Sequence, residues 1–435
     1  MPGPAGSPGT PTPSGSPARP EIEPAAIRRR IKRTLLATQS FGSAGFLVAS
    51  TVTPIVGAAL TGRASWAGVP ATFYWGGGAV FALLWGRLMD PLGRRLTLTL
   101  GLISGIIGAA IAASAIGAGS FAGFVAGLAL MGGANTAIQL ARFVAAEVHP
   151  AAERGRAISM VVMGGTVGGV LGPLLVAPTS RLAESFGRPG LAGPYAASAG
   201  FFLVGAIIVM TLLRPEPRDV ARALGGSTTP VASDAQGPRT VRAILADRWV
   251  VVAVFSMLLS QGVMSMLMVI SSLHMRNHQH PLSAISLVMS SHMVGMYGFS
   301  LVTGKLADSW GRGPLIAVGA GLLVVAGLGA IWAVAAVPMT GVLFLLGLGW
   351  NLCYVGGSTL LSDRLTQIER ARVQGINDAL LTSASAVGSL MSGIVFSRVG
   401  YPAMGIVAAA VALIPLALGW SLPRGSGHTA IQTAP

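Results

Sequence analysis

Apolar residues are grouped along the chain in long stretches separated by short polar segments. The stretches recur from residue 34 to residue 422. An α-helix needs about 20 apolar residues to cross the hydrocarbon core of a membrane, and each stretch is about that long. The pattern predicts twelve membrane-spanning helices, near residues 34–60, 66–89, 96–117, 119–143, 157–178, 193–213, 249–273, 282–306, 314–335, 338–361, 372–396 and 401–422.

The gap between the sixth and seventh predicted helices divides the chain into two halves. It contains Pro, Ser and Arg residues, which are typical of a linker. The first residues are rich in Pro, Gly and Ser and cannot bury enough apolar surface to fold. We therefore expect an all-α membrane protein with two pseudo-symmetric six-helix halves. The predicted regions are a disordered tail at 1–27, the first half at 28–213, a cytoplasmic linker at 214–248, the second half at 249–422 and a cytoplasmic tail at 423–435.

The composition agrees with this assignment. Charged residues make up 10% of the 435 residues, against roughly 25% in soluble proteins, and hydrophobic residues make up 52%. No catalytic triad, phosphate loop or hydrolase motif is present, so we expect neither an enzyme nor a resident cofactor. The net charge is +15, but the basic residues are distributed among the segments between the apolar stretches and do not form one cluster. This distribution argues against a nucleic-acid partner. The single cysteine, Cys353, excludes an internal disulfide.

The basic residues also predict the orientation. Arg28–Arg33 directly precedes the first apolar stretch, as a cytoplasmic flank does, and that stretch is too long for a cleaved signal peptide. With the amino terminus in the cytoplasm, most of the 29 Lys and Arg residues fall on the cytoplasmic side. The positive-inside rule therefore places both termini in the cytoplasm and the protein in the inner membrane. The exceptions are Arg63, Arg181, Arg188, Arg276 and Arg398.

Two motifs occur twice, at nearly the same separation along the chain. The sequence from Gly86 to Arg95, GRLMDPLGRR, returns as GKLADSWGR from Gly304, and Glu-Arg-x-Arg starts at both Glu153 and Glu369. The repetition indicates an internal duplication of six helices. The first motif resembles the cytoplasmic loop signature of the major facilitator superfamily, although Pro91 and Ser309 stand where that signature has a basic residue. The resemblance implies a transporter, usually monomeric, that works by alternating access.

The loop motif carries charges that can pair with other helices. Asp90 lies at the end of a predicted helix, where it can pair with an arginine such as Arg142 and face the positive end of another helix. The resemblance implies that this contact closes the cytoplasmic side and breaks during transport. The predicted gating residues are Asp90, Arg94, Arg95, Arg142, Asp308 and Arg312.

Methionine and histidine are concentrated in the seventh and eighth predicted helices. Residues 257–296 hold eight of the 17 methionines and four of the six histidines. Met264 and Met268 are one helical turn apart, and so are His292 and Met296. At about 1.5 Å per residue, Met264 and His292 lie at similar depths, roughly 14 Å below the outer boundary. We therefore predict that these four residues share one site.

Thioether and imidazole groups select soft metal ions. They favour Cu(I), whereas Mg²⁺ or Ca²⁺ would require carboxylates that this region lacks. The loop after Met268 adds His274, Met275, His278 and His280, which we expect to collect the metal. The paired motifs resemble those of CcoA-type copper importers, a branch of the superfamily that supplies copper for cytochrome oxidase assembly. The resemblance implies uptake of Cu(I), as cargo, into the cytoplasm.

The competing interpretation is proton-coupled efflux or uptake of a small organic molecule, such as a drug or a vitamin. The segment from Gly164 to Pro173, GGTVGGVLGP, partly resembles the motif of the superfamily's drug antiporters, and its glycines are equally consistent with close helix packing. Asp378, in the eleventh predicted helix, is the candidate for proton coupling. A receptor or scaffold without transport is a third class, for which the chain shows no added sensor domain.

Overall fold

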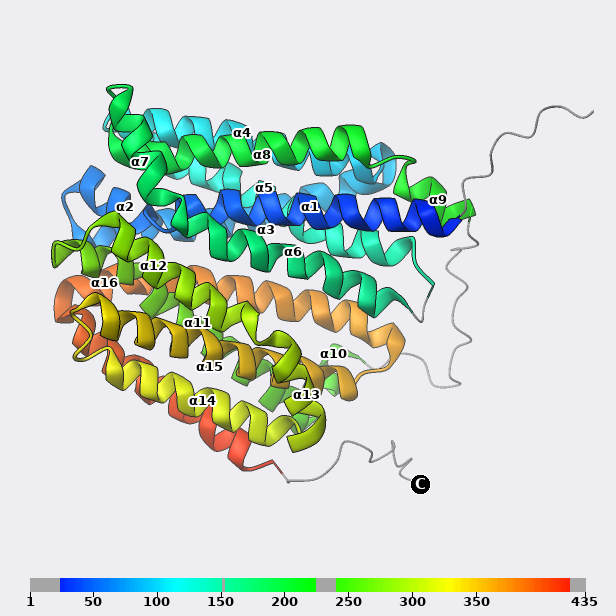
Figure 1. Cartoon of the computed structure of the whole chain (residues 1–435). Coiled ribbons are helices and arrows are strands. Elements are labelled where there is room, and N and C mark those ends of the chain that lie inside the picture. The colour runs from blue at the N-terminus through cyan, green and yellow to red at the C-terminus, as the bar shows by residue number, and fades with distance from the viewer. Residues whose placement is uncertain (1–23, 151–152, 224–239, 423–435) are drawn as a thin grey trace, which may run out of the picture.

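The computed structural model describes residues 24–150, 153–223 and 240–422, and within these ranges all regular structure is helical. Long helices lie side by side in two groups, the first formed by α1 to α8 and the second by α11 to α16 (Figure 1). The helices of the first half are α1 (Pro24–Ser50), α2 (Thr53–Thr61), η1 (Ala64–Trp66), α3 (Val69–Leu92), α4 (Arg94–Gly117), α5 (Phe121–Glu147), α6 (Arg154–Leu174), α7 (Val176–Ser185), η3 (Gly190–Ala192) and α8 (Gly193–Leu212).

The second half follows two short helices, α9 (Pro217–Ala223) and α10 (Val241–Leu245), which lie within the predicted linker. Its helices are α11 (Arg248–Asn277), α12 (Leu282–Met293), the π-helix η4 (Val294–Gly298), α13 (Ser300–Trp310), α14 (Arg312–Gly329), α15 (Ala336–Asp363) and α16 (Gln367–Trp420). The first long helix of each half packs against the fifth long helix of that half, α1 against α6 and α11 against the first part of α16. The predicted all-α fold with two related halves is confirmed.

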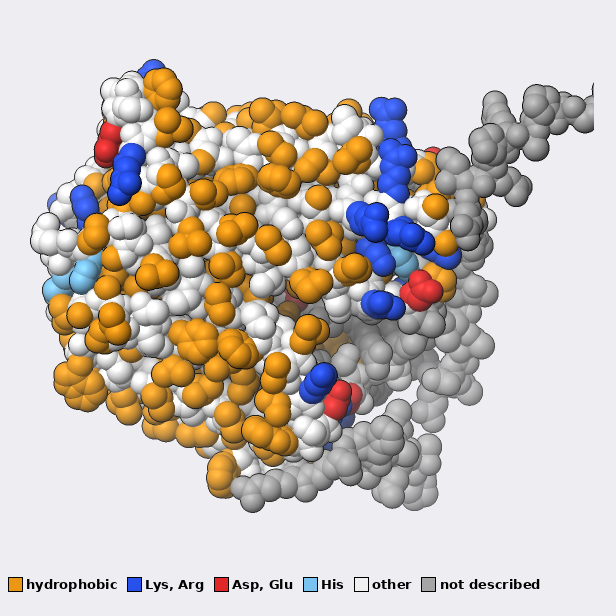
Figure 2. Space-filling model, viewed as in Figure 1, with side chains coloured by type: hydrophobic (Ala, Val, Ile, Leu, Met, Phe, Trp, Pro, Cys, Tyr) orange, Lys and Arg blue, Asp and Glu red, His pale blue; other side chains and the backbone are white. Residues whose placement is uncertain are grey.

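The membrane-spanning segments agree with the apolar stretches. Ten described segments are long and apolar enough to cross a membrane, and eleven if the bent pair of α12–η4 and α13 is one span. The longest segment, Val373–Trp420, consists of two helices joined at Gly400, where φ is 75°. Counting these two separately accounts for the twelve predicted spans. Large apolar side chains such as Val337, Leu301 and Trp332 are exposed on the surface, which is largely apolar along its length (Figure 2).

Some predicted boundaries differ from the structure. The first predicted span is two helices, because the chain breaks after Ser50 and Pro54 lies in the first turn of α2. Helix α1 already begins at Pro24, inside the predicted disordered tail, so that boundary was wrong. The rest of the tail, residues 224–239 of the linker and the predicted carboxy-terminal tail lie outside the described residues.

The repeated loop motif makes the same turn in both halves. Gly93 separates α3 from α4 with φ 82°, and Gly311 separates α13 from α14 with φ 91°. A residue with a Cβ atom rarely adopts this left-handed region, so each copy of the motif needs its second glycine there. The next residue, Arg94 or Arg312, begins a helix. We call the end of the molecule that carries these two turns the basic end.

Candidate functional site

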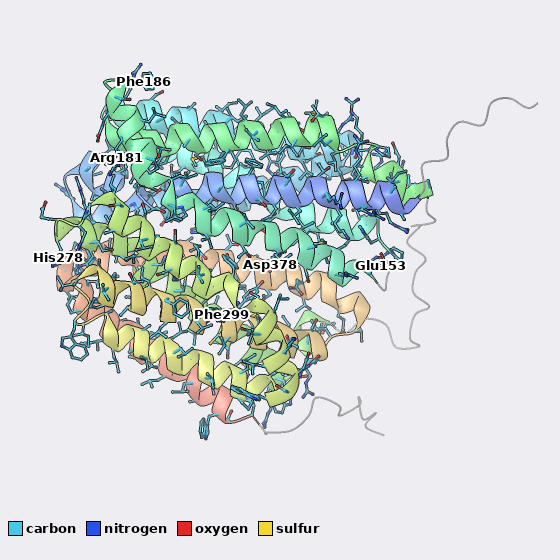
Figure 3. All side chains as sticks on the ribbon, viewed as in Figure 1. Glu153, Arg181, Phe186, His278, Phe299 and Asp378 are labelled. Atoms are coloured by element: carbon cyan, nitrogen blue, oxygen red, sulfur yellow. The ribbon has the colours of Figure 1, made fainter. Side chains whose placement is uncertain are left out.

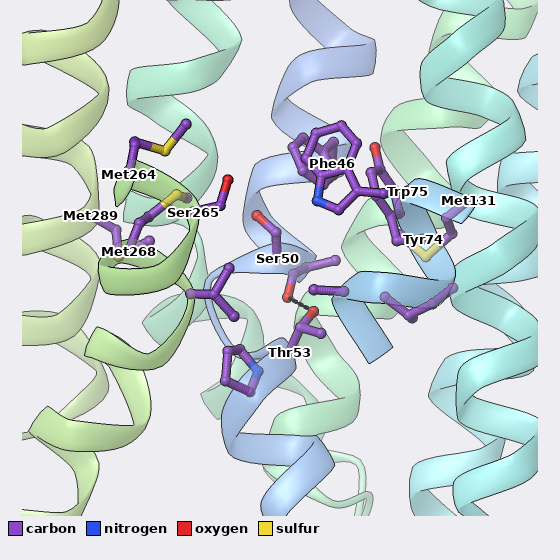
Figure 4. Close-up of a pocket in the computed structure, with 15 residues that line it drawn as sticks. Phe46, Ser50, Thr53, Tyr74, Trp75, Met131, Met264, Ser265, Met268 and Met289 are labelled. Carbon is purple, nitrogen blue, oxygen red and sulfur yellow. Dashed lines mark hydrogen bonds between the residues drawn. The ribbon is translucent and has the colours of Figure 1, made fainter. Parts of the chain in front are cut away.

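A pocket lies between the two halves of the molecule (Figure 4). It encloses about 640 Å³ of empty space, its open mouth included. The first half contributes residues of α1, α2, α3 and α5, and the second half contributes residues of α11 and α12. None of the lining side chains carries a charge. They are Phe46, Ala49, Ser50, Thr53, Pro54, Ala71, Tyr74, Trp75, Leu128, Met131, Met264, Ser265, Met268, Val269 and Met289.

Three aromatic rings form the wall of the pocket in the first half. The rings of Phe46 and Tyr74 are stacked, with centroids 4.5 Å apart and planes inclined by 15°. Trp75 meets Tyr74 edge to face, with centroids 5.2 Å apart. The Tyr74 hydroxyl is buried and has no hydrogen-bond partner among the described residues. This wall offers flat apolar faces to the pocket.

Hydroxyl groups lie where α1 gives way to α2. The Thr53 hydroxyl is 2.8 Å from the Tyr195 hydroxyl, and the Ser50 hydroxyl donates to the Leu47 carbonyl at 3.3 Å. The helix break places these groups at the pocket, because the end of α1 and the start of α2 both line it. They can position a cargo that forms hydrogen bonds but has no net charge.

The structure brings together only part of the predicted metal site. Met264 and Met268 line the pocket, and Met289 of α12 joins them (Figure 4). His292 and Met296 are buried but do not line the pocket. The two predicted pairs therefore do not meet at this pocket, and a third thioether takes the place expected for the second pair.

His292 is directed toward α15. It is fully buried, and its Nδ1–H donates to the Leu343 carbonyl at 2.7 Å. Its Nε2 atom has no hydrogen-bond partner among the described residues. Other residues of α12 face the first half instead, since Ser290 donates to the Val170 carbonyl at 2.9 Å and Met293 lies beside Gly169.

The predicted capture residues lie around the loop between α11 and α12. The rings of His274 and His278 have centroids 4.5 Å apart, and His274 also stacks on Tyr401 at 4.4 Å. The Nε2 atoms of His274 and His280 bond to the carbonyls of Ala333 and Val334. Met275 is buried. Across the described ranges, no group of three or more His, Cys, Asp or Glu residues is placed to hold a metal ion.

The predicted gating residues form the same arrangement in both halves, at the basic end. Arg94 bonds to Glu147 with both Nε and Nη2 at 2.9 Å and pairs with Asp90 at 3.3 Å. Arg312 likewise pairs with Asp363 at 2.9 Å and with Asp308 at 3.6 Å. The arginine of each motif thus binds the end of another long helix of its own half.

The expected pair of Asp90 with Arg142 is not present. Arg142 of α5 instead pairs with Asp378 of α16 at 3.1 Å, across the boundary between the halves. Asp90 extends from the end of α3, where its side chain is 86% exposed and contacts Arg94 of the next helix. Arg95 contributes its backbone N–H, which is bound by Glu216.

Sequence reasoning missed two groups of residues. Phe46, Tyr74 and Trp75 look like ordinary apolar positions of a spanning helix, and their pattern along the chain does not single them out. Glu147 and Asp363 end α5 and α15, each the second long helix after a copy of the motif. Comparing the two halves position by position could therefore have identified them.

These features define a polytopic membrane transporter, and comparison with known proteins gives its family. A model described as "Major Facilitator Superfamily" matches residues 65–275 and 253–432, so the chain belongs to that superfamily. Its members are transporters and not enzymes, as predicted.

Individual relatives cover nearly the whole chain. The chain is 33% identical to the "Uncharacterized MFS-type transporter YdeG" of Bacillus subtilis, over 90% of this chain and 93% of that protein. It is 26% identical to the "Riboflavin transporter RfnT" of Brucella anthropi, over 93% and 99% respectively. The crystal structure of a D-xylose-proton symporter matches with a TM-score of 0.70 at 17% identity, over 92% and 99%, which shows a shared fold.

Proposed function

We propose that the protein is a secondary transporter of a small, uncharged aromatic molecule, which binds in the pocket between the halves. One observation carries the proposal: a wall of three aromatic rings faces three methionines across a pocket whose lining has no charged side chain. A permanently charged cargo would lack a counter-charge there. A flat ring would stack on the aromatic wall, while the unbranched methionines adapt to its other face.

The hydrogen-bonding groups of the pocket narrow the cargo further. The hydroxyl groups of Ser50, Thr53 and Ser265 suit a molecule with several neutral hydrogen-bonding groups. The similarity to a protein named as a riboflavin transporter supports this class, because riboflavin combines a flat, uncharged ring system with such groups. Riboflavin is therefore the first probe.

Cu(I) is the second candidate cargo, and the sulfur atoms at the pocket favour it. Met264, Met268 and Met289 present neutral, soft ligands from two helices to one space. The predicted contribution of His292 and Met296 would require α12 to turn relative to α11 during the transport cycle. Copper transport stays a prediction, now with Met264, Met268 and Met289 as the proposed ligands at the pocket.

The two cargoes are distinguished in liposomes that contain the purified protein. We would measure fluxes of labelled riboflavin and labelled Cu(I) in both directions, beside empty liposomes. The wild type should move riboflavin, and Trp75→Ala should slow it roughly three- to tenfold, the effect of losing about 1 kcal/mol of aromatic stacking. Trp332→Ala is the matched control, because the Trp332 side chain is 74% exposed on the outer surface.

A second variant tests the sulfur atoms. Met264→Leu keeps most of the side-chain volume and removes the thioether, so riboflavin flux should change little. Copper flux that exceeds the empty liposomes and is lost in Met264→Leu, without any riboflavin flux, would replace the aromatic cargo by Cu(I). If neither label moves, both cargo assignments are wrong.

A further inference from the structure

One ion pair connects the two halves at the level of their spanning helices. Arg142 belongs to α5 and Asp378 to α16, and their side chains approach to 3.1 Å (Figure 3 labels Asp378). Arg142 precedes the end of α5 by five residues and Asp378 follows the start of α16 by eleven. At 1.5 Å per residue these positions are about 8 Å and about 16 Å from the respective helix ends. Both charges therefore lie within spanning helices.

The pair lies between the pocket and the basic end. On α5, Met131 lines the pocket and Arg142 follows eleven residues later, about 16 Å closer to Glu147 at the basic end. In the second half, Asn377, the neighbour of Asp378, contacts Met257, which precedes the pocket residue Met264 on α11 by seven residues. A cargo moving from the pocket to the basic end must pass this level.

The pair is also reachable by water, although it is confined. The side chains of Arg142 and Asp378 are 26% and 34% exposed. The Arg142 Nε atom is buried without a hydrogen-bond partner among the described residues, so the guanidinium depends on Asp378 for its counter-charge. The phenol of Tyr354 on α15 is a titratable group that interacts with both residues.

We infer that the Arg142–Asp378 pair couples proton binding to the opening of the transport route toward the basic end. A proton that binds the Asp378 carboxylate converts it to a neutral carboxyl group, while Arg142 keeps its own proton and charge. The electrostatic attraction between the halves is then lost at this level, and an unpaired guanidinium within the membrane favours separation toward water. Deprotonation restores the pair and closes the route. The inference uses the proposed pocket as the transport route but is independent of the cargo.

The test uses the single native cysteine of the chain, which is buried. In a Cys353→Ser background, Ser50→Cys places one thiol in the pocket. A membrane-impermeant maleimide is applied to inside-out vesicles that are held at pH values from 8 to 5 during labelling, and each rate is divided by that of a free-thiol standard at the same pH. The basic end is predicted to face the outside in these vesicles. The corrected labelling rate should be about tenfold higher at pH 5 than at pH 8.

Variants of the pair identify the responsible group. Asp378→Asn, which imitates the protonated carboxyl, should label fast at every pH, and so should Arg142→Gln, whereas Asp378→Glu should keep the pH response. Glu184→Gln changes an exposed carboxylate at the opposite end and should behave like the wild type. The inference would be overturned by a wild-type labelling rate that does not change with pH. A pH response like that of the wild type in Asp378→Asn or Arg142→Gln would overturn it as well.

Transport provides a second readout. In liposomes, a pH gradient should accumulate labelled riboflavin with wild type but not with Asp378→Asn, while riboflavin exchange at equal pH on both sides should persist in that variant. Accumulation by Asp378→Asn equal to wild type would contradict the inference. If the wild type moves no riboflavin, the proposed cargo fails, while the labelling experiment still decides the role of the pair.

Discussion

At the scale of single residues, glycine sets how closely two helices approach. A Cβ atom at Gly164 or Gly168 of α6 would overlap the carbonyl oxygens of Leu36 or Ser40 of α1, and one at Gly172 would lie 2.9 Å from the Ala44 carbonyl. These positions are four residues apart, so they form one stripe along α6. The sequence left open whether these glycines belong to an antiporter motif or allow close helix packing. The observed contacts with α1 explain them by close packing.

This contact gives a prediction for stability. Gly168→Ala should lower the free energy of unfolding by about 1–3 kcal/mol, because the added Cβ atom meets backbone that cannot move aside locally. Gly165→Ala is the matched control on the same helix, since its Cβ would meet only side-chain atoms of Ser43 and Gln39, at 3.2 Å and 3.3 Å. Thermal unfolding of the purified variants in detergent measures both. Equal stability of the two variants would refute the packing explanation.

At the scale of elements, the rotation of each helix about its own axis decides which residues reach the pocket. Met289 and Met293 are spaced along α12 as His292 and Met296 are, and spacing alone could not choose between these pairs. The packing of α12 against α6 and α15 directs Met289 to the pocket and His292 to Leu343. The π-helix after Met293 and the 41° bend before α13 also change the direction in which nearby side chains point. The residue pattern did not predict either feature.

The position of His292 predicts a structural effect of its removal. His292→Ala loses the hydrogen bond to Leu343 and leaves a space between α12 and α15, so the free energy of unfolding should fall by about 1–3 kcal/mol. His278→Ala is the control, because that exposed ring hydrogen-bonds to a carbonyl of its own helix and contacts the neighbouring His274 ring, and it does not connect two helices. The measurement is the melting temperature with and without Cu(I). A fully stable His292→Ala protein that no longer gains stability from Cu(I) would support the original ligand role instead.

At the scale of the whole molecule, the sequence predicted the architecture better than the site. Long apolar stretches specify spanning helices almost regardless of their partners, and the duplicated motif specified the two related halves. The pocket, in contrast, is formed by residues from six helices. Its aromatic residues are of types that also occur where a spanning helix faces lipid or packs against a neighbour, so the sequence does not distinguish them. The Arg142–Asp378 pair joins residues of different halves. Its formation depends on how the halves dock, which no local sequence pattern predicts.

The docking of the halves predicts how the other end of the molecule opens. Near the start of α3, Thr72 donates to the Ala386 carbonyl at 3.2 Å, and a Cβ atom at Gly68 would overlap the Ser389 carbonyl oxygen of α16. The halves are therefore in backbone contact beyond the pocket, at the end opposite the basic end. Gly68 has an ordinary φ of −83°, so a side chain there is compatible with the helix itself and conflicts only with this closed arrangement.

Gly68→Val should consequently shift the protein toward a state that is open at this opposite end. With Ser50→Cys in the Cys353→Ser background, an impermeant maleimide applied to right-side-out vesicles should label the pocket roughly tenfold faster than without Gly68→Val. Gly76→Val is the matched control on α3, because a Cβ atom there meets nothing within 4 Å. The labelling from inside-out vesicles should fall in parallel, since a rocking movement that opens one end closes the other. Labelling that rises from both sides would instead mean that Gly68→Val loosens the whole interface between the halves, and unchanged labelling would show that this backbone contact does not hold the end closed.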